Sequence, residues 1–531
     1  MEQKGQQYKN VHTILMEQAA RYPDKAYIIN PDQGKSITFK ETAEWCNRIA
    51  NFLSQHGLQS TDRVCLIGEN SIETLILFLA VLNYGATISP INVEESKENH
   101  YYMINHARPK IVFYGEELAF DKEKFKAATW IPYSYSGIGN GQKDGFFASL
   151  KQYRPEFNNP IGDKNDLAHI VFTSGTTSTP KCVISTREAF SYMPLDTVDR
   201  LKITDKDIIL DYRPYNWNSP QVLSIMPGLI SGATVVYAKT FSRSRFDSWL
   251  KDYGITICVG VPTVINMLLE RQSTLHKRDL PALRFMTSST APLLIRNQLE
   301  FEQKYGIPIN QQAGSSETAW MALNDPADIG TDKRKIGSIG KPPIYKEVFI
   351  IDDTGKRLKP GEEGEIIVKG KSLAYGYMWE DGTVGKFPED GFHTGDLGYM
   401  DKDGCIFITG RKKNQVVRGG VKISPAEITN WIMEHPAVQV AETIGVPDKV
   451  YGEDVVSFII TKEGEKLTEK EILEHCRKKL PAFKMPKAIF FMKEFPVGTT
   501  GKISKQGLLK VWEEKQGKSA EGGVISYKGD K

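Results

Sequence analysis

The stretch that decides the fold runs from residue 63 to residue 92 and reads RVCLIGENSIETLILFLAVLNYGATISPIN. A short apolar run is followed by an apolar stretch of helical length that ends at Gly85, and then by a second short apolar run. Their lengths and the turn residues between them predict strand, helix and strand. The preceding SITF at 36–39 and ETAEWCNRIANFLSQHG at 41–57 predict another strand and helix. The whole stretch therefore predicts βαβαβ, the repeat unit of a layered sheet with helices on its faces.

The same alternation continues to about residue 320. Strand-like runs that end in small or turn residues lie at 169–175, 207–217, 233–238, 255–263, 283–289 and 308–317. Residues 347–370 and 393–410 then alternate around Asp-Gly and Gly-rich turns, which predicts an antiparallel sheet or small barrel. We expect an α/β protein: a large N-terminal domain, residues 1–412, with layered sheets and this small sheet, then a small mobile α+β domain, residues 413–531.

The composition excludes several classes of protein. The chain has 68 Lys and Arg against 65 Asp and Glu. The resulting formal charge of +3 does not indicate binding to nucleic acid or to an anionic membrane. The start, MEQKGQQYKN, has no secretory signal, and the longest apolar run, 75–82, is far short of the roughly 20 residues that span a bilayer. The six cysteines have no metal-ligand spacing. We expect no membrane span, a cytoplasmic location and free, mostly buried thiols.

A loop rich in hydroxyl groups, FTSGTTSTPKCV at 172–183, raises the question of function. Small residues with free backbone N–H groups, closed by a lysine, can wrap around phosphate oxygens. The loop is not a Walker loop, because Gly175 is followed by TTST, Pro180 and Lys181 rather than by the glycine and Lys-Ser/Thr that a Walker loop requires. Taken alone, the loop is compatible with a phosphate site or with a Ser/Thr-rich surface turn.

Four other residues have a functional and an ordinary interpretation. Glu317 follows two serines at a strand end, where it could bind Mg²⁺ beside phosphates or be an acidic residue in the first turn of a helix. Asp396 could accept hydrogen bonds from ribose hydroxyls, or it could be an ordinary turn residue. Arg411 and Lys502 are single cations, and most such residues are merely solvated.

The order and spacing of five segments resolve these alternatives. They are FTSGTTSTPK (172–181), GSSE (314–317), GEIIVKGKSLAYGY (364–377), HTGDLGYMDKDGCIFITGRKKNQVVRGGVKISPAEI (393–428) and FPVGTTGKISK (495–505). Together they resemble the superfamily of adenylate-forming enzymes, which includes acyl-CoA synthetases, adenylation domains of peptide synthetases and luciferases. The resemblance extends from about Val11 to Leu509.

The resemblance implies a nucleotide site in which a carboxylate attacks the α-phosphate of ATP and expels pyrophosphate. It assigns ATP or AMP binding to Thr173, Ser174, Gly175, Thr176, Thr177, Lys181, Ser289, Thr290, Ala291, Ala313, Gly314, Ser315, Asp396 and Arg411. Ser316 takes the place of a threonine near the α-phosphate, and Glu317, with Thr173, matches the magnesium site. Lys502 matches the catalytic lysine that stabilises charge on the transferring phosphate.

The resemblance also implies a second half-reaction after rotation of the small domain. It places the hinge at Lys413 and puts Gly419 and Gly420 on the tunnel through which a thiol arrives, although a plain hairpin turn explains the same two glycines. The residues that match a coenzyme A site are Tyr451, Phe483, Lys484 and Lys487. An exposed aromatic residue with lysines suits an adenine ring and phosphates, whereas Phe483 could also belong to the core.

The acid is less defined. The segment DYRPYNWNSPQ, where relatives that activate amino acids use an aspartate, has no acidic residue from Tyr212 to Gln221, and Arg213 would repel an ammonium group if it faced the pocket. Tyr215, Trp217 and Asn218 are the candidate pocket residues, and Trp217 is either a gate that shortens the pocket or a core residue. Aliphatic, cyclic and aromatic acids of small to medium size all fit.

Four positions depart from the usual pattern of the superfamily. Ser178 and Cys182 replace glycines, Arg187 replaces a histidine, and Ala313 replaces the aromatic residue that stacks on adenine. Loss of the stack would weaken ATP binding by about 1 kcal/mol. Ser178 would strain the loop if the glycine that it replaces needed a positive φ.

The sequence therefore predicts an ATP- and Mg²⁺-dependent ligase that joins a small carboxylic acid to CoA. Two alternatives remain: a stand-alone adenylating enzyme that loads a separate carrier protein, and a nucleotide-binding protein that has lost catalysis. The sequence leaves monomer and homodimer equally open.

Overall fold

The computed structural model describes residues 7–138, 145–173, 180–271, 273, 275–496 and 503–520, without the side chains of 516–520. The chain divides into two compact units. The first unit consists of Met1–Phe349, Ile367–His393 and Met400–Phe407, and the second of Ile350–Ile366, Thr394–Tyr399 and Ile408–Lys531.

Two sheets, each with eight strands in the described residues, form the frame of the first unit. The first sheet has, in spatial order, β14 (Ala322–Leu323), β13 (Ile309–Ala313), β12 (Phe285–Ser288), β11 (Ile257–Cys258), β9 (Ile208–Asp211), β10 (Thr234–Tyr237), β1 (Ala26–Asn30) and β2 (Lys35–Thr38). The second has β18 (Val384–Lys386), β17 (Gly376–Met378), β8 (Cys182–Thr186), β7 (Leu167–Phe172), β4 (Thr87–Asn92), β3 (Arg63–Gly68), β5 (Ile111–Gly115) and β6 (Thr129–Tyr133).

Helices cover both faces of these sheets. The α-helices of the first unit are α1 (Val11–Arg21), α2 (Phe39–Gln55), α3 (Ile72–Tyr84), α4 (Lys97–Ala107), α5 (Phe146–Ser149), α6 (Arg187–Leu201), α7 (Asn218–Pro220), α8 (Met226–Ser231), α9 (Phe246–Asp252), α10 (Pro262–Leu269) and α11 (Ile295–Tyr305). Shorter turns are the 3₁₀ helices η1 (Lys122–Phe125), η2 (Leu150–Gln152), η4 (Lys277–Asp279) and η5 (Pro326–Asp328) and the π-helix η3 (Gln221–Ile225).

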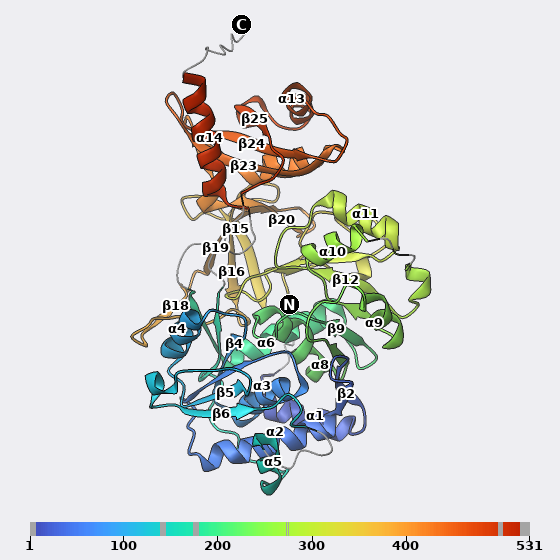
Figure 1. Cartoon of the computed structure of the whole chain (residues 1–531), viewed down its shortest axis with the longest axis vertical. Helices are drawn as coiled ribbons and strands as arrows, with labels where there is room; N and C mark the ends of the chain where they lie inside the picture. The colour runs from blue at the N-terminus through green and yellow to red at the C-terminus, as the bar shows by residue number, and fades with distance from the viewer. Residues whose placement is uncertain are drawn as a thin grey trace. The chain divides into compact units, whose positions relative to one another are not determined.

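The packing of the apolar side chains shows the order of the layers. The outer face of the first sheet packs against α9, α10 and α11, and Figure 1 shows these helices beside β9 and β12. Its inner face shares one large apolar cluster with α1, α2, α3, α6, α8 and the second sheet. The other face of the second sheet packs against α4. The predicted class, layered α/β sheets with helices on their faces, is confirmed.

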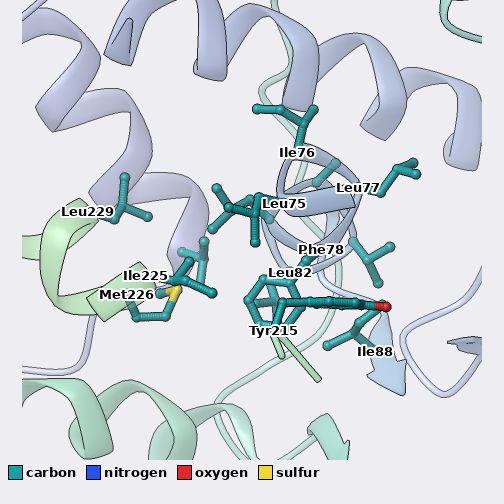
Figure 2. Close-up of a cluster of buried hydrophobic side chains, with 14 of the residues drawn as sticks. Leu75, Ile76, Leu77, Phe78, Leu82, Ile88, Tyr215, Ile225, Met226 and Leu229 are labelled. Carbon is teal, nitrogen blue, oxygen red and sulfur yellow. The ribbon is translucent and has the colours of Figure 1, made fainter. Parts of the chain in front are cut away.

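Helix α3 lies at the centre of this cluster. All thirteen of its residues are buried, Ser71 caps its start by accepting from the Thr74 N–H at 3.1 Å, and Gly85 ends it with φ of 99°. The helix packs against β3 and β4 of one sheet and β1 and β2 of the other, which explains why its sequence is apolar on every side. Figure 2 shows its side chains beside Tyr215 and the residues of η3 and α8.

One prediction about the strands needs correction, and one strand pairing was not predicted. The βαβαβ stretch does not lie in one sheet: β3 and β4 pair in parallel in the second sheet, whereas β2 pairs with β1 in the first. The strand before the hydroxyl-rich loop leads into an antiparallel neighbour, because β7 pairs with β8, which the sequence pattern did not reveal. Local periodicity predicts a strand but not the partner it joins.

The second unit contains a five-stranded sheet in the described residues. Its elements are β21 (Val416–Arg418), β22 (Val421–Ile423), α12 (Pro425–Met433), β23 (Val438–Asp448), β24 (Gly452–Thr461), α13 (Glu469–Arg477), β25 (Ala488–Phe491) and α14 (Lys505–Ala520), with 3₁₀ turns η6 (Lys412–Asn414) and η7 (Ala482–Lys484). Helix α14 packs against β23, as Figure 1 shows. The predicted α+β class of this part of the chain is thus confirmed.

A further sheet has the order β15 (Lys346–Ile351), β16 (Gly364–Gly370), β19 (Phe392–Met400) and β20 (Ile406–Arg411), and its strands contribute residues to both units. All six cysteines are free and buried, as predicted. In the described part of the chain, every helix is too short or too polar to cross a membrane.

A buried ion pair fastens helix α6 to the start of β15 in the first unit. The Lys346 ammonium lies 3.0 Å from the Asp196 carboxylate, and both side chains are fully buried. Asp196 also accepts from the Tyr345 N–H at 3.1 Å and from the Ser372 hydroxyl. Burial lowers the pKa of Lys346, and Asp196 opposes that effect.

Lys346→Met is expected to lower the free energy of unfolding of the first unit by about 3–5 kcal/mol, because Asp196 would keep a buried charge without its partner. Lys335→Met is the matched control, since Lys335 pairs with Asp403 at 3.2 Å on the surface and its loss costs at most about 1 kcal/mol. Urea unfolding of the two variants measures the difference. Equal midpoints would contradict the assignment of the buried pair as a stabilising contact.

Candidate active site

The hydroxyl-rich loop connects the antiparallel strands β7 and β8. Ser174, Gly175, Thr176 and Thr177 of the predicted phosphate loop, and Ser178, lie outside the described residues. Its two ends are joined: the Thr173 N–H donates to the Lys181 carbonyl at 3.0 Å, and the Lys181 N–H donates to the Thr173 hydroxyl at 3.2 Å. The pairing of β7 with β8 therefore brings two of the predicted phosphate ligands together.

Cys182, one of the departures from the superfamily pattern, is the first residue of β8 and lies opposite Phe172. Its side chain is buried against Ile170, Ile184 and Met378, and burial raises the pKa of Cys182 to about 12. Cys182 is not among the residues with positive φ, as a strand residue needs none. Ser178, for which loop strain is expected, lies outside the described residues.

Arg187, another departure, begins α6 and is 9% exposed. Its guanidinium donates to the carbonyls of Ile161 and Gly85 and lies 4.0 Å from Asp166. These contacts give it a structural role at the base of α6.

The segment Gly314 to Thr318 forms a tight turn directly after β13. The Ser315 N–H donates to the Thr318 hydroxyl at 3.0 Å, and the Thr318 N–H donates to the Ser315 hydroxyl at 3.2 Å. A Cβ at Gly314 would lie 1.6 Å from the Ala319 carbonyl oxygen, so only glycine fits. The turn leaves Ser316 and Glu317 partly exposed at the end of β13.

A tyrosine that sequence reasoning missed holds Glu317. The Tyr377 hydroxyl donates to Oε1 of Glu317 at 2.7 Å, and the ammonium of Lys181 lies 5.0 Å from the centre of the Tyr377 ring. Burial and the Glu317 carboxylate raise the pKa of Tyr377, which keeps the hydroxyl protonated as a donor. Tyr377 thus connects the end of the phosphate loop to the predicted magnesium ligand. It closes the quoted segment GEIIVKGKSLAYGY, but nothing local distinguishes it from Tyr375.

Two of the segments predicted to bind ATP or AMP, 289–291 and 313–315, lie at the ends of two neighbouring strands. Strand β12, which ends before Ser289, pairs in parallel with β13, whose last residue is Ala313. The Ser289 hydroxyl is buried and has no hydrogen-bond partner among the described residues, and Thr290 has φ of 75°. A β-branched residue with positive φ is strained, and such strain gathers at functional sites. Thr290 and Ala291 are exposed.

The candidate acid-binding segment contains one residue of the core and one exposed residue. Tyr215 is 1% exposed, lies among the apolar side chains in Figure 2, and donates its hydroxyl to the Leu66 carbonyl at 2.6 Å. This is the position of a core residue. Trp217 is 40% exposed, so its alternative interpretation as a core residue is wrong. Asn218 is buried and donates to the Ser316 carbonyl at 3.3 Å, which brings this segment to the Glu317 turn.

Arg213 does not present a free charge. Its guanidinium lies 2.7 Å from the Asp211 carboxylate, both side chains are almost fully buried, and Nη1 donates to the Ser219 hydroxyl at 3.0 Å. The predicted repulsion of an ammonium substrate by Arg213 is therefore not supported, since Asp211 neutralises its charge.

Two residues predicted to contact ribose are paired in the second unit. Asp396 lies within β19 rather than at a turn, it is 6% exposed, and Nε of Arg411 lies 2.5 Å from Oδ1 of Asp396. Lys413 follows in the exposed 3₁₀ turn η6, and its neighbour Lys412 lies 2.7 Å from Glu365.

The predicted tunnel glycines form the two-residue turn of the hairpin β21–β22. Val417 pairs with Lys422 and Arg418 with Val421, while Gly419 and Gly420 have φ of 57° and 87°. Two positive φ values are what a type I′ turn requires, so the hairpin interpretation explains both glycines. The tunnel role stays a prediction.

The residues predicted to bind CoA lie on the same unit. Tyr451 and Phe483 are 48% and 47% exposed, so Phe483 is not a core residue. Lys484 lies 2.6 Å from Glu427 and Lys487 lies 2.5 Å from Asp448, and the Lys487 ammonium lowers the pKa of Asp448 to about 2. Both predicted phosphate-binding lysines are thus paired with carboxylates. Lys502 lies outside the described residues.

Comparison with known proteins gives one consistent result. The model of the AMP-binding enzyme family matches residues 15–378, and that of the AMP-binding enzyme C-terminal domain matches residues 427–502. The chain is 31% identical to sulfoacetate–CoA ligase of Cupriavidus necator and 28% identical to oxalate–CoA ligase of Arabidopsis thaliana, in each case over 94% of this chain and 98% of the relative. The crystal structure of ATP-bound MatB from Rhodopseudomonas palustris superposes with a TM-score of 0.82 at 27% identity, covering 96% of this chain and 100% of that one.

The matched family segments contain the Thr173–Lys181 loop ends and the Glu317 turn described above. The chain therefore belongs to the AMP-binding enzyme family, in which it is an ATP-dependent acid–CoA ligase.

Proposed function

We propose that this ligase first forms an acyl-adenylate at the Glu317 turn and then transfers the acyl group to the thiol of CoA. The observation that supports the first step is the chain of contacts from Lys181 through Tyr377 to Glu317. It joins a cation suited to phosphate oxygens, just before β8, to a carboxylate suited to a metal, in the turn after β13.

In the first half-reaction, an oxygen of the substrate carboxylate attacks the α-phosphorus of ATP. A new P–O bond forms, the bond from the α-phosphorus to the bridging oxygen breaks, and pyrophosphate leaves. Thr173 and Lys181 would bind the phosphates, Ser316 would lie near the α-phosphate, and Lys502 would stabilise its developing charge. Asp396 and Arg411 would bind the ribose, with Ser289 to Ala291 and Ala313 to Ser315 around the adenine.

The chemistry of Glu317 fits a magnesium ion. Tyr377 donates to one carboxylate oxygen, and within the described residues no side chain donates to the other. The same part of the chain contains no group of three or more His, Cys, Asp or Glu that could hold a metal. Mg²⁺ suits such a place because it takes one or two carboxylates and completes its shell with substrate phosphates and water. When bound, it neutralises phosphate charge; Glu317 and Thr173 would hold it.

In the second half-reaction, the CoA thiol loses its proton, the sulfur attacks the acyl carbonyl, the bond from the acyl carbon to AMP breaks, and AMP leaves. We place the hinge for the change of pose at Lys413, with domains 1–412 and 413–531. This position lies in the exposed 3₁₀ turn η6, a short connector between β20 and β21. Tyr451, Phe483, Lys484 and Lys487 would contact CoA, which requires the two lysines to leave Glu427 and Asp448.

The choice of acid rests on Trp217 and Asn218, next to the Glu317 turn. The relatives act on acids as different as sulfoacetate, oxalate and indoleacetate. Because Arg213 is neutralised by Asp211, we do not assign it to a second acidic group of the substrate.

The test is acid-dependent exchange of labelled pyrophosphate into ATP, with Mg²⁺ and without CoA. The panel includes small diacids, sulfonated acids, arylacetic acids, short aliphatic acids and amino acids. A strong signal for one class supports acyl-adenylate formation and identifies the acid. That acid is then incubated with ATP and either free CoA or a phosphopantetheinylated carrier protein. Thioester with CoA supports the proposal; thioester with the carrier alone would overturn its second half.

A further inference from the structure

Strand pairing and backbone hydrogen bonds fix the position of Tyr377. It lies in β17, which pairs with β8, so that Tyr377 is opposite Val183 and close to the end of the phosphate loop. The backbone just before it is fixed as well, because the Ala374 N–H donates to the Glu317 carbonyl at 2.8 Å and the Tyr375 N–H donates to the Ile184 carbonyl at 2.8 Å. Glu317 is therefore contacted by the same short segment through both its backbone and its side chain.

The anchor of this segment is the buried ion pair of the first unit. The Ser372 hydroxyl donates to Asp196, which also pairs with the Lys346 ammonium. The segment from Ser372 to Tyr377 is thus fixed at one end by a buried charge pair and at the other by strand pairing. A side chain supported in this way has little freedom to leave its hydrogen bond.

We propose that Tyr377 is a positioning residue for the metal and triphosphate, acting through Glu317 and Lys181. Its hydroxyl occupies one oxygen of the Glu317 carboxylate and leaves the other for Mg²⁺, while its ring holds the Lys181 ammonium near the phosphate loop. This inference rests on the proposed role of Glu317 as a metal ligand.

The two parts of the side chain have separable effects. Among the described residues, the hydroxyl donates to the Glu317 carboxylate alone. Its removal is therefore expected to change the affinity for ATP when Mg²⁺ is present and to leave the affinity for metal-free ATP unchanged. The ring contacts Lys181, whose positive charge attracts phosphate with or without metal, so its removal weakens both. Phenylalanine keeps the ring and loses the hydroxyl, whereas leucine loses both.

The experiment is calorimetric titration of the full-length chain with ATP, in Mg²⁺ and in EDTA. Tyr377→Phe is expected to raise the Kd for ATP about tenfold in Mg²⁺, a usual effect of losing a partner of a metal ligand, and to leave the Kd in EDTA unchanged. Tyr377→Leu is expected to raise both values. Tyr375→Phe is the matched control, because the Tyr375 ring lies 5.0 Å from the Lys386 ammonium instead, and it should change neither.

A double-mutant cycle with Glu317→Gln isolates the route of the effect. If the Tyr377 hydroxyl acts through the Glu317 carboxylate, Tyr377→Phe adds no further loss of Mg²⁺ dependence in the Glu317→Gln background. An equal loss in Mg²⁺ and EDTA, or full additivity in the cycle, would overturn the positioning role. If Glu317→Gln itself leaves the Mg²⁺ dependence intact, the assignment of Glu317 fails and the inference fails with it. If only Tyr377→Phe is silent, the inference alone fails.

Discussion

Lys502→Ala is expected to reduce acid-dependent exchange of pyrophosphate into ATP by about 10²–10³-fold, the usual cost of removing one preorganised group that stabilises transition-state charge. The expectation comes from the match of FPVGTTGKISK to the superfamily. It concerns the first half-reaction alone, since the proposed rotation of the small domain would remove the lysine from the site. The measurement is the exchange rate at saturating acid, ATP and Mg²⁺.

The second half-reaction provides the internal control for this variant. Thioester formation from synthetic acyl-adenylate and CoA should proceed at the rate of the unmodified chain. Lys505→Ala is the matched control for charge, because Lys505 lies 3.4 Å from Glu442 and has no assigned role. Unchanged exchange in Lys502→Ala, or an equal loss in both half-reactions, would contradict the assignment.

Glu317→Gln is expected to lower the exchange rate by about 10²-fold at physiological Mg²⁺, since several kcal/mol of charge stabilisation by the metal depend on its binding and each 1.36 kcal/mol is worth about tenfold. The amide keeps an oxygen that can accept from Tyr377, so the local fold is retained while the charge is lost. We expect part of the activity to return as Mg²⁺ is raised, which a titration of rate against Mg²⁺ measures.

Glu300→Gln, on the exposed side of α11, is the matched control and should leave this titration unchanged. If Glu317→Gln kept both the rate and the Mg²⁺ requirement of the unmodified chain, the metal would have to be held by other groups.

Much of the candidate site was accessible from the sequence because its parts lie in contiguous segments. The ends of the phosphate loop adjoin β7 and β8, the Glu317 turn follows β13, and Asp396 and Arg411 lie within β19 and β20. The surroundings of the Tyr215 and Arg213 side chains could not be predicted from contiguous segments. Both lie in one polar segment after β9, and only the packing shows that one enters the core and the other meets Asp211.

The departures from the superfamily pattern illustrate the same limit. Cys182 matches a glycine of the superfamily's phosphate loop, yet it is a buried strand residue, because the pairing of β7 with β8 begins at that position. A residue's backbone requirement depends on the hydrogen bonds of its neighbours across the sheet, which the linear pattern does not contain.

By itself, the sequence determined the α/β class, the family resemblance and the order of the catalytic segments, since each depends on residue spacing within short stretches. Only the tertiary structure decided that β2 and β3 join different sheets and that α3 is buried between these two sheets. It also decided that Tyr377 donates a hydrogen bond to the Glu317 carboxylate, sixty residues away in the sequence. The physical reason is that these contacts are chosen by the packing of whole layers, in which partners distant in sequence compete for the same buried surface and the same hydrogen bonds.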